Sequence, residues 1–376
     1  MKNLSKSKVD LFNQLFLIEC NWQNVFYMHT PFCLRKCHYC IYGSKVPGSR
    51  EEIKTFYSSV IPRQIAQYKH TLENVKFDQI YFGGGTPTIV DADTLEGVYE
   101  KIPNFKDIPI KATEISPYTV TDEHIDLFHK YRFAYVSMGV QTLNKRVLEK
   151  ENRFVANPEK INYICLRLDE YNIINNIDLI FYLDSGELEN LDTSRNDLEI
   201  MMSIIRPVSM TLHFNYRIPK SSEKRLAMIK LIKEMLEKYP EYRCINSLLE
   251  ESEVEFDMAN SAEYRLARKR EDFLFYMLPK IPQHHSYGHN MLSIGEFKDI
   301  KPRYNYYYVY DFMDKYLWKD YYNRTKALNL DFERTREKLG LPHHNFIKND
   351  KFFIDETGKE RFKEILKQTG NPYYEV

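Results

Sequence analysis

The sequence predicts an α/β fold in which helices cover a mainly parallel sheet. Six near-continuous apolar runs have the length of buried strands, and charged stretches with helical periodicity separate them. Strands that are apolar on both faces are typical of parallel sheets. Polar residues suited to chemistry stand where several of these runs end, which is where α/β folds place their binding sites. These observations fit either a partial β/α barrel or an open doubly wound sheet.

The predicted elements alternate regularly over the first 240 residues. The strands are NVFYMHT (24–30), FDQIYFGGG (77–85), IKATEIS (110–116), FAYVSMGVQ (133–141), INNIDLIFYL (174–183) and SMTLHFNYRI (209–218). The helices lie at about 50–70, 91–101, 121–131, 155–171, 190–205 and 221–238. The third helix carries a clear start signal, because Thr121 can cap it and Asp122 and Glu123 fall in its first turn.

The regular alternation ends near residue 240. Beyond it we expect a helix over 260–280, a charged helix over 319–339, and a strand, turn, strand and helix over 343–368, while the stretch 281–310 is rich in His, Tyr and Pro. The chain therefore divides into three parts. They are an N-terminal segment (1–23), an α/β domain (24–240) and a smaller α+β C-terminal domain (241–376).

Composition and charge point to no special partner. The chain has 53 basic and 53 acidic residues, so its charge gives no general reason to expect binding to nucleic acid or to a membrane surface. No stretch approaches the roughly 18 apolar residues of a membrane span. The apolar stretch near the N-terminus is broken by Asn13 and Gln14 and shows no small-residue cleavage pattern. We therefore expect a cytoplasmic protein without a membrane span and without a nucleic acid partner.

Three of the six cysteines crowd into one short segment, as Cys33, Cys37 and Cys40. A chain of this size does not need disulfides for stability, which favours reduced thiols and a metal. A closed zinc site takes four ligands, commonly as two separated pairs. Three thiolates in one loop can instead hold three irons of a 4Fe-4S cluster and leave the fourth iron open to a small chelating molecule. We favour the cluster over zinc, a redox pair or structural thiols, and expect the other cysteines to be core thiols: Cys20, Cys165 and Cys244.

Polar residues and glycines follow the next strands. The turn GGGTP (83–87) ends the second strand, Glu114 the third and Gln141 the fourth, and Asp178 lies in the fifth. Glycines permit close approach of the backbone, and carboxylates suit an ammonium group or ribose hydroxyls. The turn is not a phosphate loop, because no Gly-Lys-Ser/Thr follows at the required spacing. We expect these residues to gather with the cysteines at the carboxyl edge of the sheet.

The cysteine loop, with the aromatic Tyr39 before its last cysteine, resembles the radical S-adenosylmethionine superfamily. Other segments resemble its coproporphyrinogen III oxidase-like group, which includes related haem chaperones and methyltransferases. They are FYMHTPFC (26–33), YFGGGTPT (81–88), TEISPYTVTDEHIDLF (113–128), VSMGVQTLNKRVLEKENR (136–153), NNIDLI (175–180) and FNYRIP (214–219). The resemblance is clear over about 24–220 and returns in FIDETGKERFKEIL (353–366).

The resemblance implies a fold, cofactors and site residues. The fold would be a partial (β/α)6 barrel of the radical SAM type with a smaller α+β C-terminal domain. The cofactors would be an oxygen-sensitive 4Fe-4S cluster on the three cysteines and one or two molecules of S-adenosylmethionine, with an electron donor such as flavodoxin or ferredoxin. The residues implied to contact the cofactors are Tyr27, Tyr39, Gly84, Gly85, Thr86, Glu114, Gln141, Arg153, Asp178 and, for a second S-adenosylmethionine, Ile180.

Departures from the group's pattern bear on the reaction. Coproporphyrinogen oxidases carry a further cysteine where this chain has Tyr42. The His-Asn-aromatic-Trp element of the haem chaperones is not intact, and Arg217 stands where the oxidase has a small residue. We therefore expect a radical enzyme that performs hydrogen abstraction or methyl-type transfer on a small aromatic, heterocyclic or peptide-derived substrate. The alternatives are a haem chaperone-like cluster protein and an oxygen-independent coproporphyrinogen III oxidase.

Two groups of histidines have no assigned role. Pro282 and Gly288 favour a loop for the first group over a helical metal pair. Either group could line a substrate pocket, and no catalytic residue is assigned. The histidines are His284, His285, His289, His343 and His344.

Overall fold

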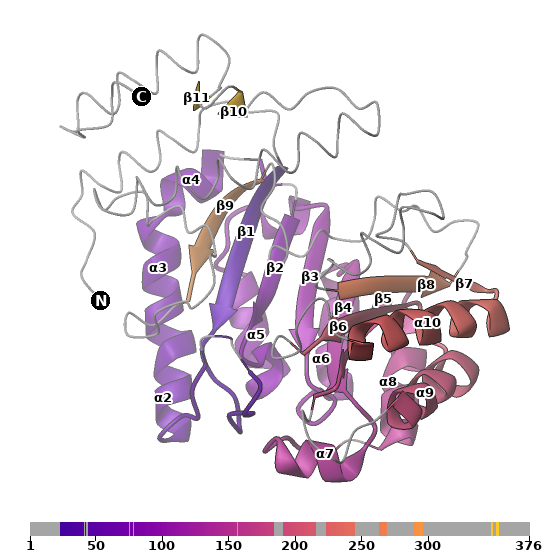
Figure 1. Ribbon diagram of the computed structural model, residues 1–376. Coiled ribbons are helices and arrows are strands. Elements are labelled where there is room, and N and C mark those ends of the chain that lie inside the picture. Colours follow the sequence, from indigo (N-terminus) through magenta and orange to yellow (C-terminus); the bar gives the residue numbers. More distant parts are fainter. Residues whose placement is uncertain are drawn as a thin grey trace.

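The computed structural model describes the central part of the chain and short segments after it. The described residues are 23–40, 42, 44–74, 76–77, 79–155, 157–183, 191–215, 223–244, 263–268, 289–295, 347–348 and 351–352. Within them the main feature is a nine-stranded sheet with the strand order β7-β8-β6-β5-β4-β3-β2-β1-β9 (Figure 1). Neighbouring strands from β9 to β6 run parallel, and β8 runs antiparallel to both β6 and β7.

All six predicted strands are confirmed, with small differences at their ends. They are β1 (Gln23–Thr30), β2 (Gln79–Gly84), β3 (Ile110–Ile115), β4 (Tyr135–Gln141), β5 (Ile174–Phe181) and β6 (Ser209–Phe214). Their carboxyl ends lie along one edge of the sheet, because all six point the same way. The sheet has two different edge strands, β7 and β9, so it is an open partial barrel.

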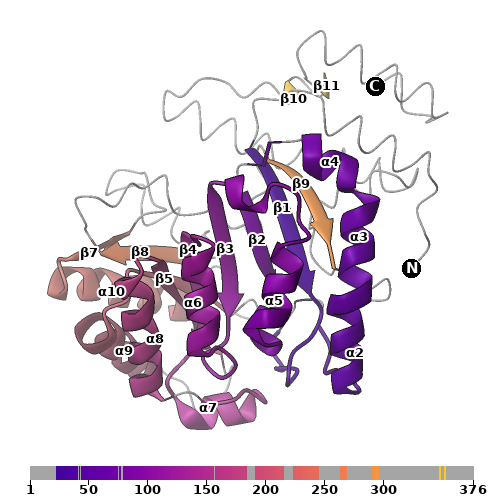
Figure 2. The ribbon, with the colours of Figure 1, turned by 180° about the vertical axis from the view of Figure 1, so that it is seen from behind.

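Helices follow the strands and cover one face of the sheet (Figure 2); they lie at about the predicted places, except for α7, which was not predicted. They are α2 (Arg50–Thr55), α3 (Ile61–Gln67), α4 (Lys69–Asn74), α5 (Ala92–Tyr99), α6 (Asp122–Lys130), α7 (Lys145–Lys150), α8 (Pro158–Glu170), α9 (Leu191–Ile200) and α10 (Glu223–Lys238). Short polar side chains cap several of them. Asp91 accepts from the Thr94 N–H at 2.8 Å, and Asn157 accepts from the Lys160 N–H at 2.9 Å. Thr121 occupies the predicted cap of α6.

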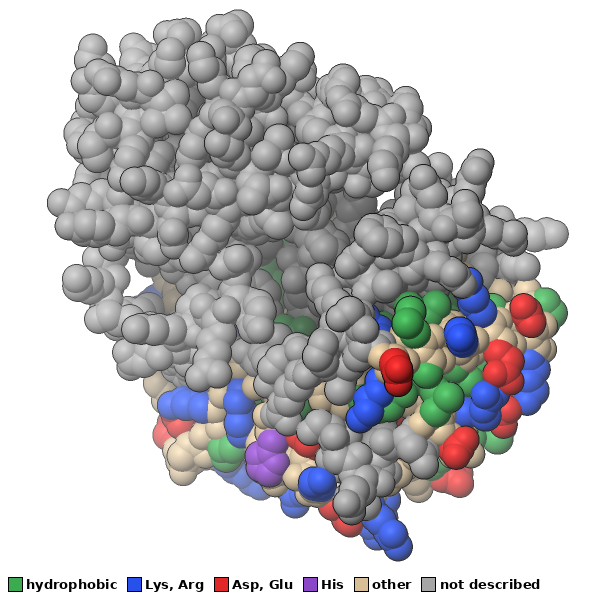
Figure 3. Space-filling model, viewed as in Figure 1, with side chains coloured by type: hydrophobic (Ala, Val, Ile, Leu, Met, Phe, Trp, Pro, Cys, Tyr) green, Lys and Arg blue, Asp and Glu red, His purple; other side chains and the backbone are tan. Residues whose placement is uncertain are grey.

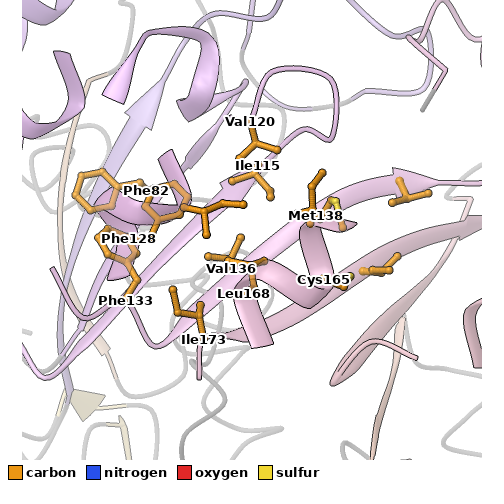
Figure 4. Packing of buried hydrophobic residues seen from close by; sticks show 14 of the residues in the cluster. Phe82, Ile115, Val120, Phe128, Phe133, Val136, Met138, Cys165, Leu168 and Ile173 are labelled. Atoms are coloured by element: carbon orange, nitrogen blue, oxygen red, sulfur yellow. The ribbon is translucent and has the colours of Figure 1, made fainter. Parts of the chain in front are cut away.

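The two faces of the sheet have different cores. The large core lies between the sheet and the helices, where Phe82, Phe128 and Phe133 meet beside Val136 and Ile115 (Figure 4). The opposite, barrel-interior face carries a small cluster made mainly of tyrosines. Its members are Val25, Tyr27, Tyr81, Ala112 and Tyr135. Toward the carboxyl ends of the strands this interior face becomes polar, and the candidate site lies there.

The prediction of a helix over 260–280 is wrong for residues 263–268, which are the residues of this range that the structure describes. Residues Glu263–Arg268 form β8, which pairs antiparallel with β6 and with β7 (Tyr242–Cys244). The local sequence EYRLAR contains good helix formers, but the open edge of β6 offers ladder hydrogen bonds, and Leu266 and Ala267 become fully buried. Tertiary pairing therefore overrides local propensity.

Two further strand regions lie late in the chain. Strand β9 (His289–Ile294) pairs parallel with β1, within a stretch for which no strand was predicted. Strands β10 (Ile347–Lys348) and β11 (Lys351–Phe352) pair antiparallel, as predicted for this part of 343–368. The helices predicted over 319–339 and at the end of 343–368 lie outside the described residues. So do Cys20, Arg217, and His284, His285, His343 and His344.

Candidate functional site

The cysteine loop starts where β1 ends and is closed at its base. The Lys45 N–H donates to the Pro31 carbonyl at 2.9 Å, and the Cys33 N–H donates to the Lys45 carbonyl at 3.0 Å. Phe32 is fully buried and packs edge-on against Phe56. The sequence PFC thus places an apolar anchor directly before the first thiol. The loop base is fixed even though its middle carries polar residues.

The middle of the loop rests on the end of α7. The His38 N–H donates to the Glu151 carbonyl at 3.1 Å, and Asn152 Nδ2 donates to the Lys36 carbonyl at 3.1 Å. His38 Nδ1 also lies 3.0 Å from the Lys150 carbonyl. Residues more than a hundred positions apart therefore hold the three thiols in one conformation.

The three thiols are partly buried and face the same cavity. Thr86 Oγ1 donates to Cys33 Sγ at 3.4 Å, and Arg153 Nη1 donates to Cys37 Sγ at 3.8 Å. Burial raises the pKa of the Cys40 thiol, although the Lys36 ammonium opposes this. Among the described residues, no three His, Cys, Asp or Glu side chains converge as ligands of a single metal ion. In a 4Fe-4S cluster each cysteine binds a different iron, so its thiols need not converge on one point.

Arg153 links the cysteine loop to β4. Its Nη1 donates to the Tyr39 hydroxyl at 2.8 Å, and its Nη2 donates to the Gly139 carbonyl. Burial raises the pKa of Tyr39 well above its usual range, so this phenol stays neutral and hydrogen-bonded. The resemblance implied that Arg153 reaches the cofactor's carboxylate. In the structure its guanidinium lies between the thiol loop and the strand end, and it lines the cavity.

The glycine turn after β2 packs tightly against β1. Gly84 has φ +105°, and a Cβ there would lie 2.6 Å from the His29 ring, so only glycine fits. The N–H groups of Gly85 and Thr86 donate to the carbonyls of Thr30 and Phe32 at 2.6 and 2.8 Å. These N–H groups are therefore used within the protein, and they hold the glycine turn against β1 and the start of the cysteine loop.

Two carboxylates lie deeper on the barrel-interior face. Glu114 accepts from the Tyr81 hydroxyl at 3.0 Å and from the Gly84 N–H at 3.2 Å. Asp178 accepts from Ser137 Oγ at 2.7 Å and from Asn176 Nδ2 at 2.8 Å. Both carboxylates are thus held in fixed orientations by neighbouring strands.

His213, at the end of β6, extends the second group. Its Nε2 lies 3.9 Å from Asp178 Oδ1, and both side chains keep about a fifth of their surface exposed, 23% and 19%. His213 is opposite Ile180 in the β5–β6 register. The pair therefore occupies the side of the cavity formed by β5 and β6.

Gln141 has an unusual backbone and an unsatisfied amide. Its φ is +75°, at a shift in the register between β4 and β5. Its Oε1 is buried and has no hydrogen-bond partner among the described residues, yet Gln141 lines the cavity. A buried acceptor without a donor costs free energy of folding, so a strained residue with such an acceptor indicates a place where a ligand donates.

A single cavity of about 430 Å³ brings these residues together. Twelve of the predicted site residues line it: Cys33, Cys37, Tyr39, Cys40, Gly84, Gly85, Thr86, Glu114, Gln141, Arg153, Asp178 and Ile180. Tyr27 does not line it. Tyr27 is buried below, where its hydroxyl bonds His29 Nδ1 at 2.9 Å. His289 pairs with Gln23 at the opposite end of β1, roughly 20 Å along the strand from the cysteine loop.

Sequence reasoning missed several lining residues. They are Tyr81, Ser137, His213 and Asn215, and also Tyr118 and Phe154, which stack at 3.8 Å. A signal for His213 was present. In SMTLHF the polar Ser209, Thr211 and His213 alternate with apolar residues, which predicts a polar face toward the interior.

Comparison with known proteins agrees with this geometry. Residues 27–195, which run from β1 into α9, match the Radical SAM superfamily. This chain contains a radical SAM domain. The match includes every residue with a predicted cofactor role.

Relatives of this radical SAM domain include proteins of two kinds. The oxygen-independent coproporphyrinogen III oxidase of Helicobacter pylori is 26% identical over 342 residues, which cover 86% of this chain and 70% of that protein. The heme chaperone HemW of Haemophilus influenzae is 26% identical over 205 residues, which cover 52% of this chain and 54% of that protein. The chain thus spans about half the length of that chaperone.

A solved structure supports the fold. The coproporphyrinogen III oxidase of Escherichia coli superposes with a TM-score of 0.60 at 18% sequence identity. The superposition covers 76% of this chain and 66% of that one. At this identity the likeness establishes the partial barrel around the radical SAM domain and does not assign a reaction. No helix among the described residues is long and apolar enough to cross a membrane.

Proposed function

We propose that this chain is a radical S-adenosylmethionine enzyme, with Cys33, Cys37 and Cys40 as the ligands of a 4Fe-4S cluster. One observation carries the proposal. Three thiols from a single loop and polar groups from the ends of β2, β3, β4 and β5 line one cavity of about 430 Å³. That volume lies in the range of sites for small molecules and cofactors. The buried, unpaired Gln141 Oε1 supports a ligand that donates a hydrogen bond there.

The residues around the cavity suit the two halves of S-adenosylmethionine. Carbonyl oxygens of the glycine turn and the carboxylate of Glu114 suit an ammonium group. The Arg153 guanidinium suits a carboxylate, and Asp178 suits ribose hydroxyls. A 4Fe-4S cluster held by Cys33, Cys37 and Cys40 would supply the single electron that reductive cleavage of S-adenosylmethionine requires.

The protein's own residues then have two tasks. They position the bound S-adenosylmethionine, and they shield the reactive species. Glu114 and Asp178 are each held by two hydrogen bonds, so their oxygens are oriented before a ligand arrives. Below the cavity the interior is closed by buried rings, including Tyr27, Tyr81 and Tyr135. Because these rings are buried, this end of the site is apolar, which suits a reactive species that water would quench.

We propose that the substrate is a small aromatic, heterocyclic or peptide-derived molecule that undergoes hydrogen abstraction or methyl-type transfer. Ile180 and His213 on β5 and β6 provide one apolar and one polar group beyond the region assigned to the first S-adenosylmethionine. A second S-adenosylmethionine or the substrate would lie there. We further propose that an electron donor such as flavodoxin or ferredoxin reduces the cluster.

Porphyrinogen oxidation is a second candidate. It is favoured by the similarity to the Helicobacter pylori oxidase, which extends over 86% of this chain, compared with 52% for the chaperone of Haemophilus influenzae. Tyr42, at the position of the oxidases' further cysteine, argues against it. Haem handling without turnover is the remaining alternative.

The test is anaerobic. The cluster is reconstituted, S-adenosylmethionine and a strong reductant are added, and the adenosyl products are identified by mass spectrometry. We expect 5′-deoxyadenosine, which indicates hydrogen abstraction. Additional S-adenosylhomocysteine would indicate methyl transfer and a second cofactor site.

Two further incubations separate the alternatives. Coproporphyrinogen III is added to the same mixture, and conversion of its propionate groups to vinyl groups would select the oxidase. Tight binding of haem, with neither adenosyl product formed, would select the chaperone-like function. Failure to incorporate iron into the wild-type protein would contradict all three radical SAM functions.

A further inference from the structure

The cavity meets solvent beside an aromatic side chain. Among the described residues that line it, Leu34, Arg35 and Tyr118 are exposed, while the others are buried or partly buried. We call the place where these three lie the cavity mouth. Hydrophobic side chains on the described surface seen in Figure 3 lie scattered among charged ones, and single exposed ones are ordinary. Leu34 and Tyr118, which are 42% and 48% exposed, lie together at the mouth of one cavity, which indicates contact with a ligand.

Tyr118 is the outer member of a stack of three side chains. Its ring lies 3.8 Å from the Phe154 ring, centroid to centroid, with the two planes inclined by 4°. The Arg35 guanidinium carbon lies 3.8 Å from the centre of the same Phe154 ring. A parallel ring at that distance fills one face of Phe154, so the guanidinium must occupy the other face. The order of the stack is therefore Arg35, Phe154, Tyr118.

The outer face of the Tyr118 ring is open. Because Phe154 covers one face of this ring, the exposed 48% belongs mainly to the opposite face, the ring edge and the hydroxyl. Tyr118 also lines the cavity, so its open face borders the space that a ligand would fill. Two rings directly face to face are less favourable than offset rings, because their negative faces oppose each other. The positive guanidinium on the far face of Phe154 offsets this repulsion and stabilises the parallel arrangement.

The loops that supply the stack are fixed by other contacts. The cysteine loop is fastened to the end of α7 by the His38 N–H, which donates to the Glu151 carbonyl at 3.1 Å. In the loop after β3, the Thr119 N–H donates to the Ser116 carbonyl at 3.1 Å, and the Tyr118 N–H donates to Ser116 Oγ at 3.3 Å. These loops therefore do not need an exposed ring to hold them, which favours binding as the role of that ring.

We propose that the open face of Tyr118 binds a planar aromatic or heteroaromatic ring of the substrate at the cavity mouth. The inference rests on the proposed function and narrows its substrate to molecules that carry such a ring. Glu114 and Asp178, which are assigned to the cofactor, lie on β3 and β5, so the mouth is left for the substrate. The stack exists before the ligand arrives, so stacking on it costs little conformational entropy.

The experiment compares the binding of a flat probe with that of a matched probe that is not flat. The flat probe is β-naphthol. The matched probe is decahydro-β-naphthol, which has the same carbon skeleton and hydroxyl group but no aromatic ring. The cluster-loaded protein with bound S-adenosylmethionine is titrated anaerobically with each probe, without a reductant, and saturation-transfer NMR gives the dissociation constants.

Three variants are compared with the wild type. Tyr118→Leu keeps an apolar side chain and removes the flat ring, whereas Tyr118→Phe keeps the ring. The matched control is Tyr163→Leu, which removes a ring on α8 that is also 48% exposed. Thermal unfolding by circular dichroism checks that each variant keeps the fold.

We expect Tyr118→Leu to weaken the binding of β-naphthol about fivefold or more and that of decahydro-β-naphthol by less than about twofold, because only a flat ring stacks. Tyr118→Phe should bind β-naphthol within about twofold of wild type. Tyr163→Leu should match wild type with both probes. The affinity for S-adenosylmethionine should be the same in all four proteins.

Several results would overturn the inference. Equal weakening of both probes in Tyr118→Leu would mean an apolar contact without recognition of a ring. An unchanged affinity for β-naphthol, or no binding of it to the wild type, would remove the site. A loss of S-adenosylmethionine affinity in Tyr118→Leu would assign the stack to the adenine of the cofactor. A wild-type protein that assembles no cluster would instead contradict the proposed function, and the same titrations on cluster-free protein would still test the stack.

Discussion

Among the individual residues, Gln141 has two features that each cost free energy of folding and that folded proteins normally avoid. Its backbone has a positive φ, and its amide oxygen is buried without a partner among the described residues. Each cost is of the order of 1–3 kcal/mol. Such costs are tolerated where they orient a group toward a ligand. In the proposed function, Gln141 is therefore the residue whose buried oxygen would accept a hydrogen bond from the bound ligand.

The first prediction concerns Cys37, a proposed cluster ligand. Cys37→Ala should reduce the iron content after anaerobic reconstitution to near background, because one of three thiolates is removed. The fold should persist, since Cys37 is only partly buried and alanine keeps the carbonyl that accepts from the Cys40 N–H at 3.1 Å. Iron analysis and thermal unfolding by circular dichroism measure both. Cys244→Ala is the control and should retain iron, and normal iron in the Cys37 variant would refute the ligand assignment.

The second prediction contrasts two glycines. Gly84→Ala should destabilise the protein by about 1–3 kcal/mol and weaken S-adenosylmethionine binding, because φ is +105° and the new Cβ would lie 2.6 Å from the His29 ring. Gly97→Ala, inside α5, should stabilise it by about 0.5–1 kcal/mol, because its Cβ meets only Lys101 Nζ at 3.9 Å. Urea unfolding measures both changes. Equal effects of the two substitutions would show that the glycine turn is not tightly packed.

Most site residues could be predicted from sequence because they belong to motifs with fixed spacing. The cysteine loop, the glycine turn and the strand-end Glu114, Gln141 and Asp178 fall in this class. His213 was missed because a lone histidine in a strand has no motif. Phe154 and Tyr118 were missed because their contact joins two loops, and no local pattern encodes a contact between loops.

For the helices and strands, the buried carboxyl of Asp197 in α9 connects two parts of the fold. Its side chain accepts from Thr142 Oγ1 at 2.6 Å and from the Leu143 N–H at 3.2 Å. It thereby fixes the turn between β4 and α7, directly after Gln141 and before the helix that holds the cysteine loop. Burial raises the pKa of Asp197 from 3.8 to about 6.

The third prediction follows from this pKa. Because the folded-state pKa is raised, the stabilisation is complete below pH 4 and is lost as pH rises through 6. Asp197→Asn keeps an oxygen for Leu143 and removes the titration. The variant should therefore gain about 2 kcal/mol of unfolding free energy relative to wild type between pH 4.5 and 7.5. Urea unfolding at the two pH values checks this, and a pH-independent difference would contradict it.

Strand prediction succeeded where apolar runs were continuous and failed where pairing decided the structure. The runs at β1 to β6 are buried on both sides, so composition alone identifies them. EYRLAR at β8 is half polar, and it becomes a strand because β6 needs a partner. β9 was not predicted because the segment HNMLSI is short and begins within a region rich in His, Tyr and Pro.

At the scale of the whole molecule, one glycine fastens the end of the late strand β9, in addition to the pairing of β9 with β1. Gly295 directly follows β9, has φ +93°, and a Cβ there would lie 2.1 Å from the His29 carbonyl oxygen. Its N–H donates to Gln64 Oε1 of α3 at 2.7 Å. Gly295, at the end of β9, thus contacts both the edge strand β1 and helix α3.

The fourth prediction tests this fastening. Gly295→Ala should detach β9, so that the β1 amides facing it exchange with solvent at least tenfold faster, while β3 and β4 stay protected. Hydrogen exchange with mass spectrometry measures this. Gly48→Ala is the control, because its Cβ meets only Glu52 Oε2 at 3.6 Å. Unchanged exchange in β1 would show that β9 is held by its other contacts.

The pairing of β9 with β1 also has a consequence for biosynthesis. β1 is the first strand of the sheet to leave the ribosome and β9 is the seventh of its parallel strands to do so, yet they are neighbours. At ordinary elongation rates, roughly ten seconds to a minute pass between their emergence. Throughout this interval the edge of β1 that later pairs with β9 presents a row of unpaired backbone groups. A chaperone that covers this edge during translation should therefore raise the yield of folded protein, and a slow pause before residue 289 should lower it.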